Sequence, residues 1–389
     1  MREGWTYKTF GEVGSFLRGK SIQKADFVEK GLPCIHYGQI HTKFGVSVDK
    51  HITEIPLDLY NKSIIASHGD VIIAITSEDL EGSCKSTAWL GNYDIAVSSH
   101  AAVYKHNQNP KFIAYYLRSN TFYCEKQKYA RGFKVMEIKP TDIEKIPIPV
   151  PPISEQERIV SELDLLSGII EKKKAQLKEY DQLAQSIFYD MFGDPVTNEK
   201  GWDIFELSTI CDVRDGTHDS PKYVEFGYPL ITSKNVINGT ISFDNVNFIS
   251  EDDLNAINVR SRVDDGDIIM PMIGTIGNPV IVHKSREFAI KNVALIKFSK
   301  SDLVINIYLQ KLLDSDIYNH FVKEQNRGGT QKFVSLKAIR QFPIPLPPLS
   351  LQQSFAEKIE AIEKQKALIK QSITEVETLF NSRMDYYFN

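Results

Sequence analysis

Two long stretches of the chain repeat apolar residues every three or four positions, which is the spacing of one face of an α-helix. The first stretch follows Ser154 and the second follows Ser350. Read in sevens, each gives one narrow apolar seam, interrupted by Lys173 in the first and by Lys366 and Arg383 in the second. The predicted seam residues are Leu163, Leu166, Ile170, Leu177, Tyr180, Ala184 and Ile187, and then Ile359, Ile362, Ile369, Ile373, Val376 and Phe380. A narrow heptad seam predicts that the two helices pair as a coiled coil.

Each predicted helix is about 37 residues and about 55 Å long at 1.5 Å per residue. Two separate surface helices, each buried against its own domain, are the alternative. Helices of globular domains rarely keep a heptad frame beyond about 25 residues, which favours the coiled coil. A helix of this length between globular parts would act as a spacer.

A proline-rich connector precedes each helical stretch, with the sequence IPIPVPPISEQ from Ile146 and FPIPLPPLSLQ from Phe342. An offset of 196 residues aligns the two copies without a gap. Because proline lacks an amide donor, the connector is expected to be extended and to stay out of helices and central strands. Ser154 and Ser350 are predicted to cap the helices that follow. The chain is therefore two tandem copies of one unit.

The segment before each connector predicts a mixed α+β domain of about 150 residues. Apolar strands entered through glycine turns are predicted at 31–40 and 68–75, and their counterparts at 227–236 and 265–272. Further predicted strands lie at 93–98, 101–105, 278–283 and 288–298, and predicted helices at 110–129, 141–145, 302–325 and 336–341. The predicted organisation is a globular domain at 1–152, a helix at 153–193, a second globular domain at 194–348 and a second helix at 349–389. Loops that differ on a shared framework indicate two different targets.

The bulk composition is that of a soluble globular protein with more than one domain, because 42% of its 389 residues are hydrophobic and 25% are charged. No apolar run approaches the roughly 18 residues of a membrane span, and the N-terminus carries no signal-peptide core, so a cytoplasmic location is expected. Cys34, Cys84, Cys124 and Cys211 stand alone without metal-ligand spacing. They predict neither a disulfide framework nor a zinc site.

Charge is unevenly distributed, although the formal net charge is only −4. Residues 194–267 hold 15 acidic and 6 basic side chains, whereas 284–340 hold 5 acidic and 11 basic. Residues 104–145 hold 4 acidic and 9 basic side chains. A basic segment thus precedes each connector, which could give two phosphate-facing surfaces on an acidic protein. Solvated helix faces are the alternative explanation for any one of these lysines.

Motifs for catalysis are weak in this sequence. Residues 14–21 (GSFLRGKS) match the phosphate-binding loop pattern, but the preceding stretch is short and polar, and the second copy keeps only the glycine at Gly216. ATP binding is therefore not predicted. Asp264 and Asp265 precede Gly266 and predict a turn rather than a Mg²⁺ site, while Ser250 predicts a helix cap. No metal site and no cofactor site are expected in this chain.

Polar loop residues are the candidates for DNA contact, because Lys, Arg, Thr, Gln, Asn and His bond base edges or phosphates. In the first domain they are Lys20, Tyr37, Gln39, Lys43, Lys85, Arg131 and Lys134. In the second they are Thr217, His218, Lys222, Lys234, Asn235, Lys291, Asn292, Arg327, Thr330, Gln331 and Lys332.

The duplicated connector, the heptad helix after each copy, the Gly-Trp pairs at 4–5 and 201–202 and the run RGGTQKF at 327–333 together resemble the specificity subunit of type I restriction-modification systems. The resemblance spans the whole chain. It implies two target recognition domains, each reading one half of a split DNA sequence, and two long helices that pack antiparallel and set the gap. The first copy departs from the pattern, with RGFK at 131–134.

The resemblance further implies that the chain is not itself an enzyme. It would recruit two methyltransferase subunits and, through them, the restriction subunits. S-adenosylmethionine, ATP and Mg²⁺ are then expected on those partner subunits. Antiparallel helices would relate the domains by an approximate two-fold axis, so that an asymmetric bipartite DNA site and neighbouring chain termini are expected.

Two other function classes remain open at this point. One is a stand-alone nuclease or methyltransferase with built-in recognition domains, which would need catalytic motifs that the sequence lacks. The other is a coiled-coil adaptor without DNA affinity, which the acidic net charge favours.

Overall fold

A computed structural model describes residues 4–20, 22–132, 134–237, 239–274, 276–298, 301–325 and 333–389. The chain forms two compact units, and the division falls inside the two long helices. Unit 1 comprises residues 1–174 and 370–389, and unit 2 comprises residues 175–369. Each unit therefore holds one globular domain and a half of each long helix.

The globular part of unit 1 contains two sheets of short strands. The order of the five-stranded sheet is β2 (Gly14–Arg18), β11 (Ala101–His106), β7 (Val71–Ala74), β9 (Ser86–Trp89) and β4 (Ser47–Val48). The order of the four-stranded sheet is β5 (Thr53–Ile55), β3 (Leu32–Ile35), β10 (Ile95–Val97) and β6 (Ile64–Ala66). Strands β3 and β10 pair in parallel.

Unit 2 repeats the order of the first four strands of the larger sheet and of the first three strands of the smaller one. One of its sheets runs β15 (Asp212–Asp215), β23 (Val293–Lys297), β20 (Ile268–Pro271) and β21 (Val280–Ile281). The other runs β19 (Asn247–Ile249), β16 (Tyr228–Ile231) and β22 (Ala289–Ile290), and β16 and β22 again pair in parallel. The tandem repeat predicted from the sequence is thus a repeat of topology, and the fold class is α+β, as predicted.

Shorter elements complete the two globular parts. In unit 1 they are α1 (Phe10–Val13), η1 (Lys24–Asp26), α2 (Tyr37–Thr42), α3 (Leu57–Tyr60), β8 (Thr76–Ser77), α4 (Pro110–Tyr116), α5 (Asn120–Lys126), η2 (Gln127–Tyr129), β12 (Met136–Glu137) and α6 (Pro140–Ile143). In unit 2 they are α8 (Leu207–Ile210), η3 (Ser233–Asn235), β17 (Val236–Ile237), β18 (Thr240–Ile241), α9 (Glu251–Ser261), α10 (Asn306–Leu313), α11 (Asp316–Gln325) and α12 (Leu336–Arg340).

The proline connectors form strands in two-stranded ladders. β13 (Pro147–Val150) pairs antiparallel with β1 (Thr6–Thr9), and β24 (Pro343–Pro345) pairs antiparallel with β14 (Ile204–Glu206). Two-stranded ladders leave one edge of each strand free, so a missing proline amide is tolerated there. The connectors are extended and lie outside the larger sheets, as predicted.

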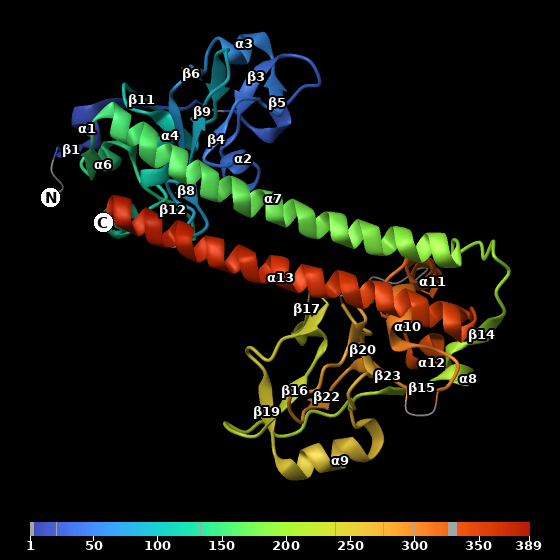
Figure 1. Ribbon diagram of the computed structural model, residues 1–389. Helices are drawn as coiled ribbons and strands as arrows, with labels where there is room; N and C mark the ends of the chain where they lie inside the picture. The colour runs from blue at the N-terminus through green and yellow to red at the C-terminus, as the bar shows by residue number, and fades with distance from the viewer. Residues whose placement is uncertain are drawn as a thin grey trace. The chain divides into compact units, whose positions relative to one another are not determined.

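Two helices of 40 residues follow the connectors, α7 (Ile153–Phe192) and α13 (Leu349–Phe388) (Figure 1). In unit 1 the first half of α7 lies antiparallel to the second half of α13, where Lys174 Nζ lies 3.0 Å from a Glu377 carboxylate oxygen. In unit 2, Lys366 Nζ lies 2.7 Å from a carboxylate oxygen of Asp181. The predicted antiparallel pairing of long helices is confirmed.

Several predicted element boundaries are wrong. The long helices begin at Ile153 and Leu349 as predicted, but Ser154 and Ser350 do not cap them, because the carbonyls of Pro152 and Pro348 accept the first helical hydrogen bonds. The helix predicted at 110–129 is interrupted where Ser119 caps α5. The helix predicted at 302–325 begins at 306 and divides into α10 and α11, and the strand predicted at 288–298 divides into β22 and β23 of different sheets. At Ser119, a short polar cap overrides the local apolar pattern.

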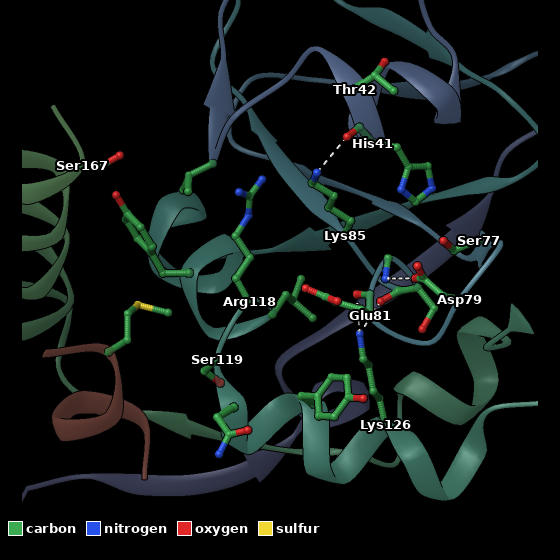
Figure 2. Close-up of a pocket in the computed structure, with 18 of the residues that line it drawn as sticks. His41, Thr42, Ser77, Asp79, Glu81, Lys85, Arg118, Ser119, Lys126 and Ser167 are labelled. Carbon is green, nitrogen blue, oxygen red and sulfur yellow. Dashed lines mark hydrogen bonds between the residues drawn. The ribbon is translucent and has the colours of Figure 1, made fainter. Parts of the chain in front are cut away.

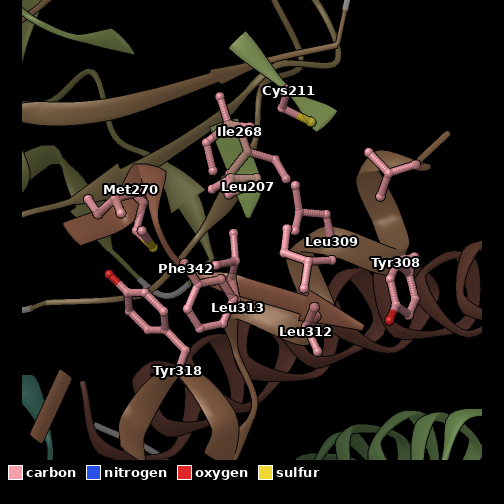
Figure 3. Close-up of a cluster of buried hydrophobic side chains, with 14 of the residues drawn as sticks. Leu207, Cys211, Ile268, Met270, Tyr308, Leu309, Leu312, Leu313, Tyr318 and Phe342 are labelled. Atoms are coloured by element: carbon pink, nitrogen blue, oxygen red, sulfur yellow. The ribbon is translucent and has the colours of Figure 1, made fainter. Parts of the chain in front are cut away.

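The largest buried cluster of each unit joins the domain to the helices. In unit 2, strand, connector and α10 residues converge on one core, which includes Leu207, Ile268, Leu312 and Phe342 (Figure 3). In unit 1, Trp5 packs against the cluster that also contains Phe388, Met384 and Tyr387 of α13. Residues near both ends of the described chain therefore belong to one unit, whereas Met1 lies outside the described residues.

The predicted seam residues differ in how deeply they are buried. Those that are buried are Leu163, Leu166, Ile170, Ala184, Ile359, Ile362, Ile369 and Ile373. Those that are half-buried are Leu177, Tyr180, Ile187, Val376 and Phe380. Lys366 and Arg383, the polar interruptions in α13, both form ion pairs with α7.

Candidate nucleic-acid interface

Three loops meet at one end of the sheets in unit 1. They follow β2, β3 and β10, and each begins where its strand ends. Lys20, after β2, forms a parallel bridge with Ser98, after β10. The backbone N–H of Tyr37, after β3, donates to Ser98 Oγ at 2.9 Å. Ser98 therefore joins the segments that carry two of the predicted DNA-contacting residues, through its backbone to Lys20 and through its hydroxyl to Tyr37.

Aromatic and basic side chains continue this cluster. The Tyr37 ring centroid lies 4.9 Å from that of His100 and 6.2 Å from that of His41. Lys85 Nζ donates to the His41 backbone carbonyl at 2.8 Å, and burial lowers the pKa of Lys85. Lys20, Tyr37 and Lys85 thus belong to one contiguous group. Aromatic faces and amines together suit stacking and phosphate contact.

A cavity of about 1630 Å³ borders this group (Figure 2). Arg118 and Lys126 also line it, and both donate to backbone carbonyls rather than to carboxylates. Burial lowers the pKa of each of these two groups. Acidic side chains of the 78–81 loop and of both long helices line it as well, so the cavity carries both signs of charge.

The matching loops of unit 2 meet in the same way. Thr217, after β15, forms a parallel bridge with Lys291, after β22. The Lys291 N–H donates to the Ile231 carbonyl at the end of β16 at 2.8 Å, and the Asn292 N–H donates to the Thr217 carbonyl at 3.2 Å. The positions of Lys20 and Ser98 in unit 1 correspond to those of Thr217 and Lys291 in unit 2.

His218 lies at the centre of this second group. Its Nε2 lies 2.8 Å from a carboxylate oxygen of Asp215, and its Nδ1 lies 3.0 Å from Asn292 Oδ1. These hydrogen bonds, first that with Asn292 and then that with Asp215, raise the pKa of His218. Arg260 of α9 also pairs with Asp215. The group is therefore cationic at its exposed side when His218 is protonated.

Two predicted residues have buried side chains that are already hydrogen-bonded. Gln39 Oε1 accepts from the His36 N–H at 3.0 Å, and Gln39 Nε2 donates to Thr53 Oγ1 at 3.0 Å. Asn235 Oδ1 accepts from the Thr232 N–H at 3.0 Å. Both amides hold the loop after the central strand of their sheet, β3 in one unit and β16 in the other.

The remaining predicted residues lie elsewhere in the two globular parts. Lys43, Lys134, Lys222 and Lys234 are exposed. Arg131 is also exposed, and its guanidinium lies 3.2 Å from a carboxylate oxygen of Asp142. Arg327, Thr330, Gln331 and Lys332 lie outside the described residues.

The sequence did not single out His41, His100, Asp215 and Arg260, which complete the two groups. The first two follow strands β3 and β10, and the signal that could have found them is the parallel pairing of those strands, which brings the loops together. Arg260 reaches Asp215 from a helix 45 residues away. The spacing of residues in the sequence does not predict that contact.

The two sequence patterns that resemble catalytic motifs, GSFLRGKS and the paired aspartates, have structural explanations. Most of the GSFLRGKS stretch is strand β2 rather than a loop, so its resemblance to a phosphate-binding loop is accidental. Lys297 Nζ donates to Asp264 at 2.8 Å and to Asp267 at 2.7 Å, around a turn in which Gly266 has φ +82°. Within the described residues, no group of His, Cys, Asp and Glu is arranged to hold a metal ion.

Ser250 caps α9 as predicted, since its side chain accepts from the Asp253 N–H. The described residues contain four free cysteines, of which Cys34, Cys84 and Cys211 are buried and Cys124 is exposed. Among the described helices, none has the length and apolar character that a membrane crossing requires.

Comparison with known families finds two matches along this chain. The family described as the type I restriction modification DNA specificity domain matches residues 2–179 and again residues 199–378. The EcoKI specificity subunit of Escherichia coli K12, a type I restriction enzyme subunit, is 22% identical, over 93% of this chain and 82% of its own length. The MjaVIII specificity subunit of Methanocaldococcus jannaschii is 24% identical, over 93% of this chain and 86% of its own length.

Solved structures share the fold. The S subunit of a type I restriction-modification system from M. genitalium aligns over 98% of this chain and 95% of its own, with a TM-score of 0.55 and 15% identity. A chain from a structural study of complex assembly and conformational transition in the type I system aligns over 100% of this chain and 98% of its own, with a TM-score of 0.59 and 17% identity.

Proposed function

The chain belongs to the type I restriction-modification DNA specificity family, and from this premise we propose that it reads an asymmetric, bipartite DNA sequence, with one half-site bound by each globular domain. Its role in that family is DNA recognition, and it is the non-catalytic specificity subunit rather than a nuclease or a methyltransferase. Neither a stand-alone enzyme nor an adaptor without DNA affinity is supported by the relatives.

The recognition domains we propose are residues 1–152 and 194–348, with 153–193 and 349–389 as spacer helices. The observation that supports this assignment is the convergence of equivalent loops. In both units, the loops after the first strand of one sheet and after the parallel strands of the other meet at one place. Loop clusters on a rigid strand framework are common sites of recognition.

The two clusters differ in chemistry, which supports an asymmetric target. Unit 1 presents Tyr37 with histidines and Lys20, whereas unit 2 presents Thr217, His218 and Lys291. Hydrogen-bonding side chains of this kind discriminate bases in the major groove, and lysines add phosphate contact. We assign base reading to these residues first, and phosphate contact to the exposed lysines Lys43, Lys134, Lys222 and Lys234.

Type I restriction-modification subunits and DNA are the partners in general terms. We propose two methyltransferase subunits, one on each half of the helix pair, and restriction subunits attached through them. Leu183 and Leu379 support two equivalent docking places, because they occupy positions 196 residues apart and are 46% and 49% exposed. We assign S-adenosylmethionine, ATP and Mg²⁺ to those partner subunits, and the assembly to the cytoplasm, where the DNA would be read.

Methylation mapping tests this proposal. The full chain is co-expressed with its methyltransferase subunits, and methylated adenines in the genome are mapped with and without it. The expected result is one motif made of two different half-sites at a fixed spacing, present only when the chain is present. Methylation of a single continuous motif, or methylation independent of the chain, would contradict the proposal.

Binding measured against salt separates DNA recognition from an adaptor role. The purified complex should bind the mapped duplex more tightly than a scrambled one, and the affinity for both should fall as salt rises, since phosphate contacts release counterions. Equal affinity for the two duplexes would remove sequence recognition from the proposal.

A further inference from the structure

A buried glutamine lies at the start of each long helix, at equivalent positions of the two copies. Gln156 lies in the first turn of α7 and Gln352 in the first turn of α13, and both are 0% exposed. A buried amide loses its water and must be hydrogen-bonded within the protein. Its partners therefore show which segments it holds.

In unit 1, Gln156 joins three segments. Its Oε1 accepts from the backbone N–H of Asn109, the residue that caps α4, at 2.9 Å. Its Nε2 donates to the Pro151 carbonyl of the connector at 2.8 Å and to Gln108 Oε1 at 2.7 Å. The first turn of the spacer helix is thus bonded to the connector and to the start of a core helix of the domain.

Unit 2 contains the same arrangement with different neighbours. Gln352 Oε1 accepts from the backbone N–H of Ile305, the residue before α10, at 2.9 Å. Its Nε2 donates to the Pro347 carbonyl at 2.9 Å and to the Leu303 carbonyl at 3.1 Å. Two of the three bonds repeat in both units, one to the backbone N–H before a core helix and one to a connector carbonyl, whereas the third partner differs. The glutamine is therefore the feature that both joints share.

We propose that Gln156 and Gln352 are positioning residues that fix the angle at which each spacer helix leaves its recognition domain, and so fix the number of base pairs between the half-sites. This inference rests on the proposed function. Neither glutamine touches DNA in this scheme, and each acts through the joint that it holds.

The length of the helix determines how far a tilt at the joint moves its far end. A helix of 40 residues is about 60 Å long at 1.5 Å per residue. One base pair adds about 3.4 Å of DNA length, so a tilt of about 3° at the joint moves the far end of the helix by one base pair. A joint held only by apolar contact would allow such a tilt, because apolar contact is not directional.

The hydrogen bonds of the buried amide are directional, whereas apolar contacts are not. Three hydrogen bonds from one planar group define both the tilt and the rotation of the first helical turn. Leucine or methionine of similar volume would fill the same space but leave a buried backbone N–H without an acceptor. The helix could then move to let water reach that N–H.

The test uses the full chain in its methyltransferase complex, with Gln352→Met as the variant and methylation mapping as the measurement. The two half-sites should stay unchanged, while the share of methylated sites with a spacing one base pair shorter or longer should rise about tenfold. A tenfold change corresponds to about 1.4 kcal/mol. Gln156→Met should give the same outcome from the other joint.

Val282→Ala is the matched control, because Val282 is buried in a cluster of unit 2 that contains no helix or connector residue. It should lower the melting temperature and leave the spacing sharp. A sharp spacing in both glutamine variants overturns the inference, and so does a changed half-site sequence. If the wild-type complex itself gives no bipartite motif, the proposed function fails instead.

A second measurement covers the case in which the methionine variants fold poorly. In Gln352→Glu the acceptor for the Ile305 N–H remains, but at most one of the two bonds to the Pro347 and Leu303 carbonyls is kept, because a buried carboxyl donates only when protonated and then only once. Amide hydrogen exchange at Ile305 should then stay slow while the spacing still broadens. Rapid exchange at Ile305 together with a sharp spacing would overturn the inference.

Discussion

At the residue scale, Gly19 and Gly216 show how close backbone contact shapes the loops that meet in the two candidate interfaces. A Cβ on Gly19 would lie 2.1 Å from the Ser98 carbonyl oxygen, and one on Gly216 would lie 2.4 Å from that of Ile290. Both glycines therefore permit the loop after the first strand to touch the loop after the parallel strand. The second glycine of the accidental phosphate-loop pattern recurs in both copies because this approach recurs.

Replacing Gly216 with alanine should destabilise the protein, because its Cβ would press on the backbone of β22. We expect a loss of about 1–3 kcal/mol, the usual cost of overpacking. Thermal unfolding measures it. Gly45→Ala is the matched control, since nothing lies within 4 Å of a Cβ at Gly45, and its melting temperature should stay close to that of the wild type.

His218 should make recognition by the second domain depend on pH. Its pKa is raised in the folded state, so the stabilisation from its bonds with Asn292 and Asp215 is complete below the unfolded pKa of 6.5 and is lost as pH rises through the folded value. A protonated ring also favours phosphate. Affinity for the cognate duplex should therefore fall several-fold between about pH 6 and pH 8.

His218→Gln is the variant that isolates this effect, because glutamine keeps hydrogen-bonding capacity without a charge change near neutrality. Its affinity should vary much less with pH over the same range, as measured by fluorescence anisotropy at constant salt. An identical pH profile for the wild type and this variant would show that His218 does not face the DNA.

At the scale of elements, the two polar interruptions of the seam in α13, Lys366 and Arg383, are paired with residues of α7. In unit 1, Arg383 binds Glu162, with one guanidinium nitrogen 3.1 Å from a carboxylate oxygen, and Tyr387 also donates to Glu162. Heptad spacing predicts that both helices present a seam, but it does not say which residues face one another. The antiparallel register decides that Arg383 meets Glu162.

Reversing one charge of this pair should lower the melting temperature, and reversing both should recover much of it. The comparison is Glu162→Arg, Arg383→Glu and the double variant, each measured by thermal unfolding of the full chain. The Arg383 hydrogen bond is the main cause that lowers the pKa of Glu162, so the contribution is present above the unfolded pKa of 4.5 and is lost as pH falls through the folded value. A double variant no more stable than either single one would contradict the pairing.

The connectors were predictable from local chemistry, whereas the pairing of strands and the burial of loop residues were not. Proline chemistry predicts an extended connector whatever surrounds it, and β13 and β24 agree. The separation of β22 from β23 was not predictable, because it depends on which sheet each strand joins and not on the continuous apolar pattern of 288–298. The burial of Gln39 and Asn235 likewise depends on their loops folding back on them.

At the scale of the whole molecule, each domain core uses aromatic residues from the far end of the other copy's helix. In unit 1, Phe112 and Tyr116 lie against Phe388, with ring centroids 5.4 and 5.6 Å apart. In unit 2, Tyr308 lies against Phe192 at 4.8 Å. The predicted boundary at the connector therefore marks a change of element, whereas the compact units divide within the helices.

Exchanging residues 1–152 for the matching domain of a relative should transplant one half-site and keep the other. The hybrid should fold only where the incoming α4 carries aromatic residues at the positions of Phe112 and Tyr116, since large-to-small changes in a core cost about 3–5 kcal/mol. Methylation mapping of the hybrid with its methyltransferase subunits provides the measurement. A change in both half-sites would contradict independent recognition by the two domains.

The sequence by itself determined the duplication, the helical period and the extended connectors, because each follows from spacing and from the chemistry of single residue types. It also placed most polar candidates on loops. Only the tertiary structure decided which of those loops meet, which amides are buried and which charges face across the helices. Those outcomes depend on strand pairing and helix register, which bring together residues that are distant in the chain.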